Sequence, residues 1–196
     1  MQSKQRKPQT ARLSQIEYMA ISMSLAVTLT MSACAQASAE YPHSADGAPM
    51  AELCLASDTQ PASTDFTDGH AIARVQTELA LTDEQRARGL MHREHLAADA
   101  GMLFYYPNSQ YRSFWMFSTL IPLDIAYLND AGEILQIITM QPCLSDNPGR
   151  CRGYESDARA RAALELNAGR FAELGVSAGD YVLDADCQSA PWAEGW

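Results

Sequence analysis

From residue 71 to residue 183 the apolar residues of this 196-residue chain fall in short runs separated by glycine, proline, asparagine or aspartate. Runs of this length, several with alternating apolar and polar residues, are typical of β-strands rather than of the long helices of a bundle. We therefore predict an α+β domain dominated by β-structure, and a barrel-like closure of its sheet would remove exposed edges. The predicted strands cover residues 71–79, 102–106, 111–117, 123–128, 133–140, 162–166 and 181–183.

Two short helices are predicted between these strands. Thr82 and Gln85 fit a capping box that opens a helix ending before Gly89. A second helix is predicted over residues 168–174, with Asn167 as its N-cap and a glycine after its last turn. Residues 141–158, rich in turn formers, are predicted to be a loop. The strands therefore carry most of the predicted fold.

The first 33 residues have the pattern of a secretory signal peptide. A basic start precedes an apolar stretch, roughly residues 19–31, which is shorter than the about 20 residues of a membrane span. The stretch runs into Met31-Ser32-Ala33-Cys34, which resembles the lipobox of bacterial lipoproteins, in which the cysteine carries the lipid. Ala37-Ser38-Ala39 fits the site of the ordinary signal peptidase, so either cleavage is compatible with the sequence, and we favour lipidation of Cys34.

Composition divides the rest of the chain into three parts. Residues 34–70 are rich in alanine, serine, aspartate, threonine and proline and show little periodicity, so we expect a tether or loosely ordered arm. Residues 71–187 form the predicted globular β-rich domain, and residues 188–196 form a C-terminal tail. The expected organisation is a single anchored domain.

The charge of the exported part excludes several partners. From Cys34 onward there are ten arginines, no lysine and 23 acidic residues, a net charge of −13. Nonspecific nucleic-acid binding depends on a basic surface, and so does adhesion to anionic lipid headgroups. We therefore expect no nucleic-acid partner, membrane contact through the lipid anchor only, and a periplasmic location.

The cysteines also fit an exported protein. If Cys34 carries a lipid, four cysteines remain, an even number that suits an oxidising compartment and allows three disulfide connectivities. We favour Cys143–Cys151, which closes a short loop, together with Cys54–Cys187, which ties the start of the chain to its end. The sequence contains no C-x-x-C and no zinc-like spacing, so we expect no metal site and no cofactor.

Four blocks of sequence carry a likeness to a known family. The blocks are Arg88-Gly89-Leu90-Met91, Gly101-Met102-Leu103-Phe104, Phe114-Trp115-Met116 with Thr119 and Ile121-Pro122-Leu123-Asp124, and Leu164-Glu165-Leu166-Asn167-Ala168-Gly169 with Gly179-Asp180. Their order and spacing, over about residues 71–184, resemble the domain of unknown function 192 family of bacteria and archaea. The resemblance implies a compact, mainly β fold, often behind a signal or membrane anchor, and supplies no reaction.

One position departs from the family pattern. Members usually have lysine and then asparagine directly after the Trp-Met pair, whereas this chain has Phe117 and Ser118. A role that needs a cation at this point is therefore in doubt for this chain. Two cysteines that flank a short loop, as Cys143 and Cys151 do, also fit many members.

The candidate binding residues lie in or beside these blocks: Arg88, Arg93, Trp115 and Asp124. Arginine beside tryptophan is a common composition of recognition patches, and arginine can hold a carboxylate or phosphate with two hydrogen bonds. The alternative, which we favour, is an internal Arg–Asp pair that satisfies a buried charge. In either case the four residues are predicted to cluster in space.

These observations favour a noncatalytic lipoprotein of the cell envelope that binds a ligand or a protein partner. We assign no catalytic residues, because the sequence lacks G-x-S-x-G and no serine or cysteine has a clear activating base. The alternative is a hydrolase with an arginine- and aspartate-lined pocket. A more remote alternative is copper handling through Met91, Met102 and Met116, whose sulfurs would have to converge near solvent; core packing explains these residues better.

Overall fold

The computed structural model describes Ser44, residues 47–57 and residues 71–193. The predicted signal peptide, the lipidation site at Cys34 and most of the predicted arm lie outside the described residues. Among the helices of the described residues, none has the length and apolar character needed to cross a membrane.

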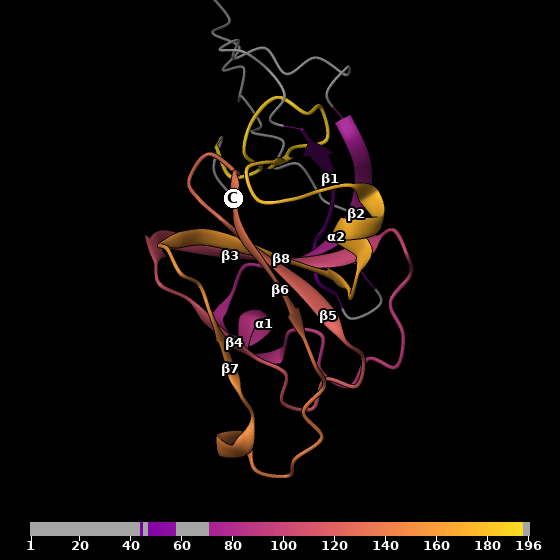
Figure 1. The fold of residues 1–196 in the computed structure, drawn as a ribbon, viewed down its shortest axis with the longest axis vertical. Coiled ribbons are helices and arrows are strands. Elements are labelled where there is room, and N and C mark those ends of the chain that lie inside the picture. Colours follow the sequence, from indigo (N-terminus) through magenta and orange to yellow (C-terminus); the bar gives the residue numbers. More distant parts are fainter. Residues whose placement is uncertain (1–43, 45–46, 58–70, 194–196) are drawn as a thin grey trace, which may run out of the picture. The chain divides into compact units, whose positions relative to one another are not determined.

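The architecture is a curled, seven-stranded mixed sheet with a separate two-stranded sheet beside it (Figure 1). The order in the large sheet is β6-β5-β8-β3-β2-β1-β9, and all neighbours are antiparallel except β2 and β3. The predicted β-dominated α+β class is confirmed. The strands are β1 (Met50–Ala56), β2 (Ala71–Ala80), β3 (Ala100–Gln110), β4 (Ser113–Trp115), β5 (Leu123–Leu128), β6 (Ile134–Met140), β7 (Gly153–Glu155), β8 (Ala160–Asn167) and β9 (Tyr181–Leu183).

The two edge strands of the large sheet approach each other at one end. Glu133, just before β6, forms an antiparallel bridge with Tyr181 of β9. The backbone N–H of Ile134 donates to the carbonyl of Asp180 at 2.7 Å, and that of Val182 donates to the carbonyl of Gly132 at 2.8 Å. The sheet is therefore a half-barrel that is joined at this end.

Each face of the large sheet buries its own apolar cluster, because side chains alternate between the faces along a strand. On β3, Leu103 belongs to the first cluster, whereas Met102 and Phe104 belong to the second. The helix α2 (Arg170–Leu174) and the C-terminal segment contribute Phe171 and Trp192 to the first cluster. The two-stranded sheet of β4 and β7 covers the second cluster with Phe114 and Tyr154.

The segment after β6 contains more structure than the predicted loop. Its residues Gly153–Glu155 form β7, which pairs with β4, and Pro148–Arg150 form the short 3-10 helix η2 (Figure 1). The predicted Cys143–Cys151 disulfide is present and closes the loop that contains η2. The predicted loop therefore lacked β7, because a three-residue strand is too short to show a period in the sequence.

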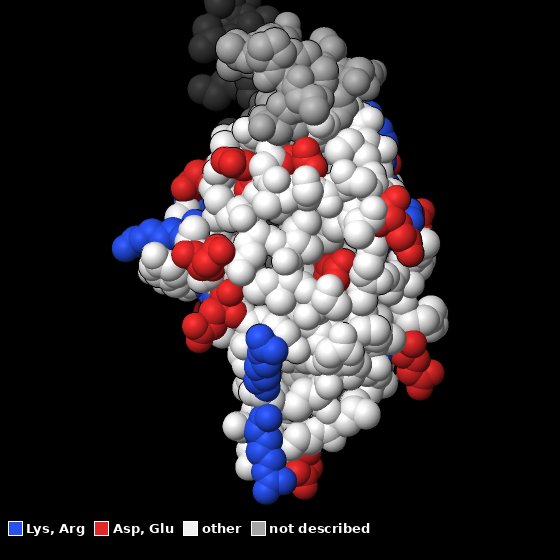
Figure 2. Space-filling model, viewed as in Figure 1, with Lys and Arg blue, Asp and Glu red and all other residues white. Residues whose placement is uncertain are grey.

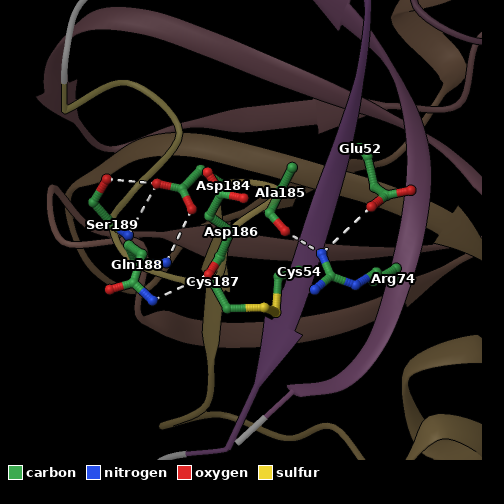
Figure 3. The surroundings of a disulfide bond; sticks show 9 residues. All are labelled: Glu52, Cys54, Arg74, Asp184, Ala185, Asp186, Cys187, Gln188 and Ser189. Atoms are coloured by element: carbon green, nitrogen blue, oxygen red, sulfur yellow. Dashed lines mark hydrogen bonds and ion pairs between the residues drawn. A yellow bond between two sulfur atoms is a disulfide. The ribbon is translucent and has the colours of Figure 1, made fainter. Parts of the chain in front are cut away.

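The structure also corrects the predicted arm and tail. Met50–Ala56 lie inside the predicted arm, yet they form β1 between β2 and β9. The predicted Cys54–Cys187 disulfide ties this strand to the C-terminal segment (Figure 3). In the predicted tail, the Trp192 indole is buried against the first cluster and donates to the carbonyl of Asp130 at 2.9 Å. Non-local pairing orders both segments, and composition alone does not reveal it.

Hydrogen bonds hold the loop around the Cys54–Cys187 disulfide. One carboxylate oxygen of Asp184 accepts from the backbone N–H of Gln188 at 2.9 Å, and the other accepts from the hydroxyl of Ser189 at 2.7 Å. The Arg74 guanidinium donates to Glu52 on β1 and to the carbonyl of Ala185 in the loop (Figure 3). These contacts fix the C-terminal loop against β1 and β2.

The two helices differ in how well their ends were predicted. The first, α1 (Asp83–Arg88), has the predicted capping box between Thr82 and Gln85. The second has Gly169 as its N-cap, and the predicted cap Asn167 instead donates to the carbonyl of Leu96 at 3.0 Å. The side chain of Asn167 contacts the loop before β3, and α2 begins at Gly169 without a side-chain cap.

Candidate functional site

The candidate site is formed by the connection between the parallel strands β2 and β3. Parallel neighbours need a long crossover, and here residues 81–99 cross over and contain α1. Arg86 fastens α1 to the sheet by donating to the carbonyl of Leu81, directly after β2, at 2.6 Å and to the carbonyl of Tyr105, on β3, at 2.8 Å. Its guanidinium also lies against the Tyr106 ring, 5.0 Å from the centroid. The crossover is thus held in place over the second apolar cluster.

A small cavity opens between this crossover, the sheet and β4, and we call it the Glu165 cavity. Its volume is about 30 Å³. Trp115, on β4, is one of its lining residues, and 48% of this residue is accessible. The cavity is lined by Arg86, Ala87, Arg88, Gly89, Leu90, Met91, Phe104, Phe114, Trp115, Thr119 and Glu165. Polar, aromatic and apolar side chains therefore meet at one opening.

Glu165 is the buried acid of this cavity. It lies on β8 directly between Met102 of β3 and Ile125 of β5, and only 4% of the residue is exposed. Within the described part of the chain, no hydrogen bond or ion pair of its carboxyl is found. Burial raises the pKa of Glu165 to about 8, because a charged carboxylate loses its hydration there. Near pH 7 the neutral acid is therefore the dominant form.

A second cavity lies on the other side of the turn at Gly89, and we call it the Arg93 cavity. Its volume is about 80 Å³. Glu78 of β2 and Arg93 face each other in it through two N–O contacts of 2.8 Å. This geometry is a two-pronged ion pair, which neutralises the largely buried Glu78. Arg88 and Gly89 line both cavities.

A family model with the description "Uncharacterized ACR", DUF192, matches residues 64–183. The chain belongs to the DUF192 family. The matched residues include every residue that lines the Glu165 cavity, whereas Cys54 and Cys187 fall outside them. The disulfide between these two cysteines therefore joins segments on either side of the part that the DUF192 model describes.

Two solved bacterial structures resemble this DUF192 chain. One is described as a candidate transcription regulator from Sinorhizobium meliloti 1021; it has 29% sequence identity and a TM-score of 0.57, over 71% of this chain and 96% of that chain. The other is a protein of unknown function from Novosphingobium aromaticivorans DSM 12444, with 28% identity and a TM-score of 0.56, over 74% of this chain and 93% of that chain. A search of the curated proteins gives no significant match. The comparisons establish the DUF192 family and its compact fold.

Three of the four predicted binding residues lie around this crossover. Arg88 and Trp115 line the Glu165 cavity, and Arg93 lines the neighbouring cavity with Arg88. Their roles as ligand-binding residues stay predictions.

Asp124 does not join this group. It is 3% exposed and pairs with Leu166 across β5 and β8, so it faces the first apolar cluster, whereas Glu165 faces the second. One of its carboxylate oxygens accepts from the hydroxyl of Thr139 at 2.7 Å, and the other accepts from the backbone N–H of Gly169 at 2.8 Å. The predicted Arg–Asp pair is wrong, because these two bonds satisfy the buried carboxylate without an arginine.

Sequence reasoning missed Glu165. The signal was its place between two leucines in Leu164-Glu165-Leu166, a charged residue in a strand that is otherwise apolar. An acid in such a strand lies either at an exposed position or in the interior of the DUF192 domain, and only the register of β8 against β3 and β5 decides which.

The described residues contain no group of three or more histidine, cysteine, aspartate or glutamate residues that could hold a metal ion. The three methionines of the copper hypothesis do not line one common cavity. Met91 lines the Glu165 cavity, Met102 lines the Arg93 cavity, and Met116 is buried in the second cluster and lines neither. This arrangement does not give the common solvent-facing point that the copper hypothesis requires.

Proposed function

We propose that this DUF192 protein is a noncatalytic binding domain of the bacterial cell envelope that holds its ligand at the Glu165 cavity. The observation that carries the proposal is the meeting of an exposed Trp115 and a largely buried Glu165 in the lining of one cavity. The Glu165 carboxyl makes no hydrogen bond to the described residues, so a ligand group in the cavity can bond to it in place of water. An exposed tryptophan adds apolar contact area with few rotatable bonds.

Binding is favoured over hydrolysis by the surroundings of the acid. General acid–base catalysis needs a second group within hydrogen-bond reach of the first or of the reacting atoms. Among the described residues that line the cavity, Glu165 carries the only carboxyl, and Asp124 faces the opposite side of the sheet. The hypothesis of a hydrolase with an arginine- and aspartate-lined pocket is therefore left without its aspartate in this cavity. The binding role is the stronger proposal.

The proposed location is the periplasmic side of the envelope, with a lipid on Cys34 as the membrane anchor. The basic and apolar start of the chain and the Met31-Ser32-Ala33-Cys34 sequence support export and lipidation. The two disulfides support an oxidising compartment.

The partner is proposed to be a small envelope ligand or a protein that presents one. The transcription-regulator description of the Sinorhizobium meliloti protein is not carried over to this chain. The part from Cys34 onward has a net charge of −13, and Figure 2 shows a mostly uncharged face on which basic side chains stand apart from one another, at the lower end, at the left and at the upper right, with acidic side chains between them. DNA binding needs a continuous basic surface.

A ligand screen tests the proposed function. Thermal shift of the mature domain is measured with panels of sugars, amines, carboxylates and phosphates, and each hit is repeated with Trp115→Ala and Tyr111→Ala. Tyr111 is an exposed aromatic residue (67%, against 48% for Trp115) that lines neither cavity, so it is the control. The proposal expects a hit that Trp115→Ala abolishes and Tyr111→Ala keeps. A screen in which every hit survives Trp115→Ala, or in which the chain turns a substrate over, would count against it.

A further inference from the structure

Two buried side chains that line the Glu165 cavity can donate hydrogen bonds to a ligand near neutral pH. Glu165 on β8 and Thr119 after β4 are each 4% exposed. The Glu165 carboxyl is mostly protonated near pH 7 and then donates through its O–H group. Among the described residues, the Thr119 hydroxyl donates only to the carbonyl of Phe117, and the distance of 3.5 Å makes that bond weak. Both side chains therefore have a donor available in the cavity.

Arg86 adds a fixed positive charge to the same lining. Its Nη1 donates to the carbonyls of Leu81 and Tyr105, and its Nη2 donates to Asp83 at 2.5 Å. These bonds hold the guanidinium in place and leave its Nε without a partner among the described residues. The Asp83 side chain is 95% exposed and the Arg86 side chain 14%, so water screens this pair. Arg88 lines the cavity as well, but it already has an interaction of its own, and we assign no ligand bond to it.

An anionic oxygen group fits this lining better than a neutral or a cationic group. A carboxylate or phosphate only accepts, so every one of these donors can bond to it, and such charge-assisted bonds are stronger than those of neutral pairs. A neutral hydroxyl brings a further donor to the lining, and an ammonium group brings three donors and the same charge as Arg86. Among the described lining residues, Glu165 is the one acidic side chain, and its neutral form does not repel an anion.

We propose that the ligand carries a carboxylate or phosphate group, which enters the Glu165 cavity and accepts hydrogen bonds from the Glu165 carboxyl, the Thr119 hydroxyl and the Arg86 guanidinium. The inference rests on the proposed function, because it names the ligand class of the same cavity. Trp115, the exposed aromatic residue of the lining, contacts the part of the ligand that carries the anionic group.

Four small compounds with the same phenyl ring test the ligand class. Benzoate and phenyl phosphate are the two anions, benzyl alcohol is the neutral probe, and benzylamine is the cation. Their affinities for the mature protein are measured at pH 7 by isothermal titration calorimetry. Because the ring is constant, the differences report the polar group. At least one anion should bind about tenfold or more tightly than the alcohol and the amine, and the tighter anion identifies which of the two groups the ligand carries.

Substitutions in the lining locate the bound anion. Glu165→Leu and Thr119→Val each remove one donor without adding charge, and they should weaken anion binding about tenfold and about threefold. Glu165→Gln keeps an N–H donor and should retain most of the affinity. Trp115→Ala should weaken every compound that binds, whereas Tyr111→Ala, outside both cavities, should change nothing. A thermal melt shows that each variant is folded.

The pH dependence supplies a result that a merely structural role of Glu165 would not give. Ionisation of this carboxyl, whose pKa is about 8, removes its donor and adds a charge that repels the anion. Benzoate affinity should therefore fall about tenfold between pH 7 and pH 9 in the parent and stay constant in Glu165→Gln. Burial raises the pKa of the neighbouring Tyr106 and Tyr127 above the usual 10, so both stay neutral over this range. The guanidinium groups of Arg86 and Arg88 stay charged.

Three results would overturn the inference. If the alcohol or the amine binds with dependence on Trp115 and Glu165 while neither anion does, the ligand class is wrong and the proposed function stands. If an anion binds equally well to the parent and to Glu165→Leu, or keeps its full affinity at pH 9, it binds outside this cavity. If none of the four compounds depends on Glu165, the inference fails, and the wider ligand screen with Trp115→Ala decides the proposed function separately.

Discussion

The carboxylate of Asp124 on β5 accepts a hydrogen bond from the backbone N–H of Gly169, 2.8 Å away, and thereby ties the strand to the turn that begins α2. Its other oxygen accepts from the Thr139 hydroxyl. Asp124→Ala leaves both donors without their partner, so we expect a loss of about 2–4 kcal/mol in the free energy of unfolding, measured by chemical denaturation. Asp157→Ala, at an exposed aspartate, is the control and should change stability by less than about 0.5 kcal/mol. Equal stability of the two variants would contradict the role of these bonds.

Glu165 should make stability fall as pH rises. Burial raises its pKa from the usual 4.5 to about 8, so between these values the folded chain keeps a proton that the unfolded chain releases. The penalty is absent below about pH 4.5 and complete above about pH 8, where it reaches up to about 5 kcal/mol. Glu165→Gln stays neutral throughout. We therefore expect the variant to match the parent at pH 4 and to exceed its stability by several kcal/mol at pH 9.

Urea denaturation across this pH range checks the prediction about Glu165. All other titrating groups are common to the two proteins, so the difference between their curves isolates this carboxyl. Parallel curves for the parent and Glu165→Gln would mean that the acid is hydrated in solution and that the cavity is more open than it is in this structure.

The two disulfides should differ in their contribution to stability. Cys54–Cys187 spans 133 residues and Cys143–Cys151 spans 8 residues. Loop entropy in the unfolded chain then predicts a loss of about 5 kcal/mol when the first is replaced by two alanines, and of about 2–3 kcal/mol for the second. Denaturation of the two double variants measures this difference. A reversed order would show that native contacts rather than loop length decide these contributions.

Trp192 and Trp115 allow the substitution of a buried tryptophan to be compared with that of an exposed one. The Trp192 residue is 6% exposed, and its ring stacks against Tyr105 with centroids 5.9 Å apart. Trp192→Ala should cost about 3–5 kcal/mol, because it opens a cavity in the first apolar cluster. Trp115→Ala, at an exposed residue, should cost less than about 1 kcal/mol. Chemical denaturation, followed by tryptophan emission or circular dichroism, measures the free energy of unfolding of both variants. A Trp192→Ala variant as stable as the parent would favour the original prediction that residues 188–196 form a C-terminal tail.

Lipidation of Cys34 is tested by mass spectrometry of the protein from a membrane fraction. We expect an N-terminal cysteine at position 34 with attached acyl chains, and release of Cys34→Ala into the soluble periplasmic fraction. An unmodified N-terminus at Glu40 would instead assign cleavage after Ala39 to the ordinary signal peptidase.

Much of the sheet could be predicted because its strands carry their own periodicity. The runs that became β2, β5, β6 and β9 match the predicted strands within one residue at either end. By contrast, β1 has a nearly continuous apolar sequence inside a segment of turn-forming composition, and its order depends on pairing with β2 and β9. The strand predicted over residues 102–106 stops before Pro107, whereas β3 continues to Gln110 past an irregular register where a missing N–H is tolerated.

The candidate site was harder to predict than the sheet. Arg88 and Trp115 were found because charged and aromatic residues stand out in the family blocks. Asp124 was misplaced and Glu165 was missed for the same reason: the side of the sheet that a residue faces depends on strand register. Both acids lie in apolar strands, and the sequence does not say which of them is already hydrogen-bonded.

The crossover between β2 and β3 has a consequence for how the lining of the Glu165 cavity can be varied. Residues 82–93 supply Arg88, Gly89 and Met91 to the cavity wall, while the ladder hydrogen bonds of the sheet are formed by residues outside this stretch. One contiguous cassette can therefore be exchanged between homologues without changing any strand pairing. In such chimeras Glu165 on β8 is unchanged, and the exchanged residues determine which side chains line the cavity beside it.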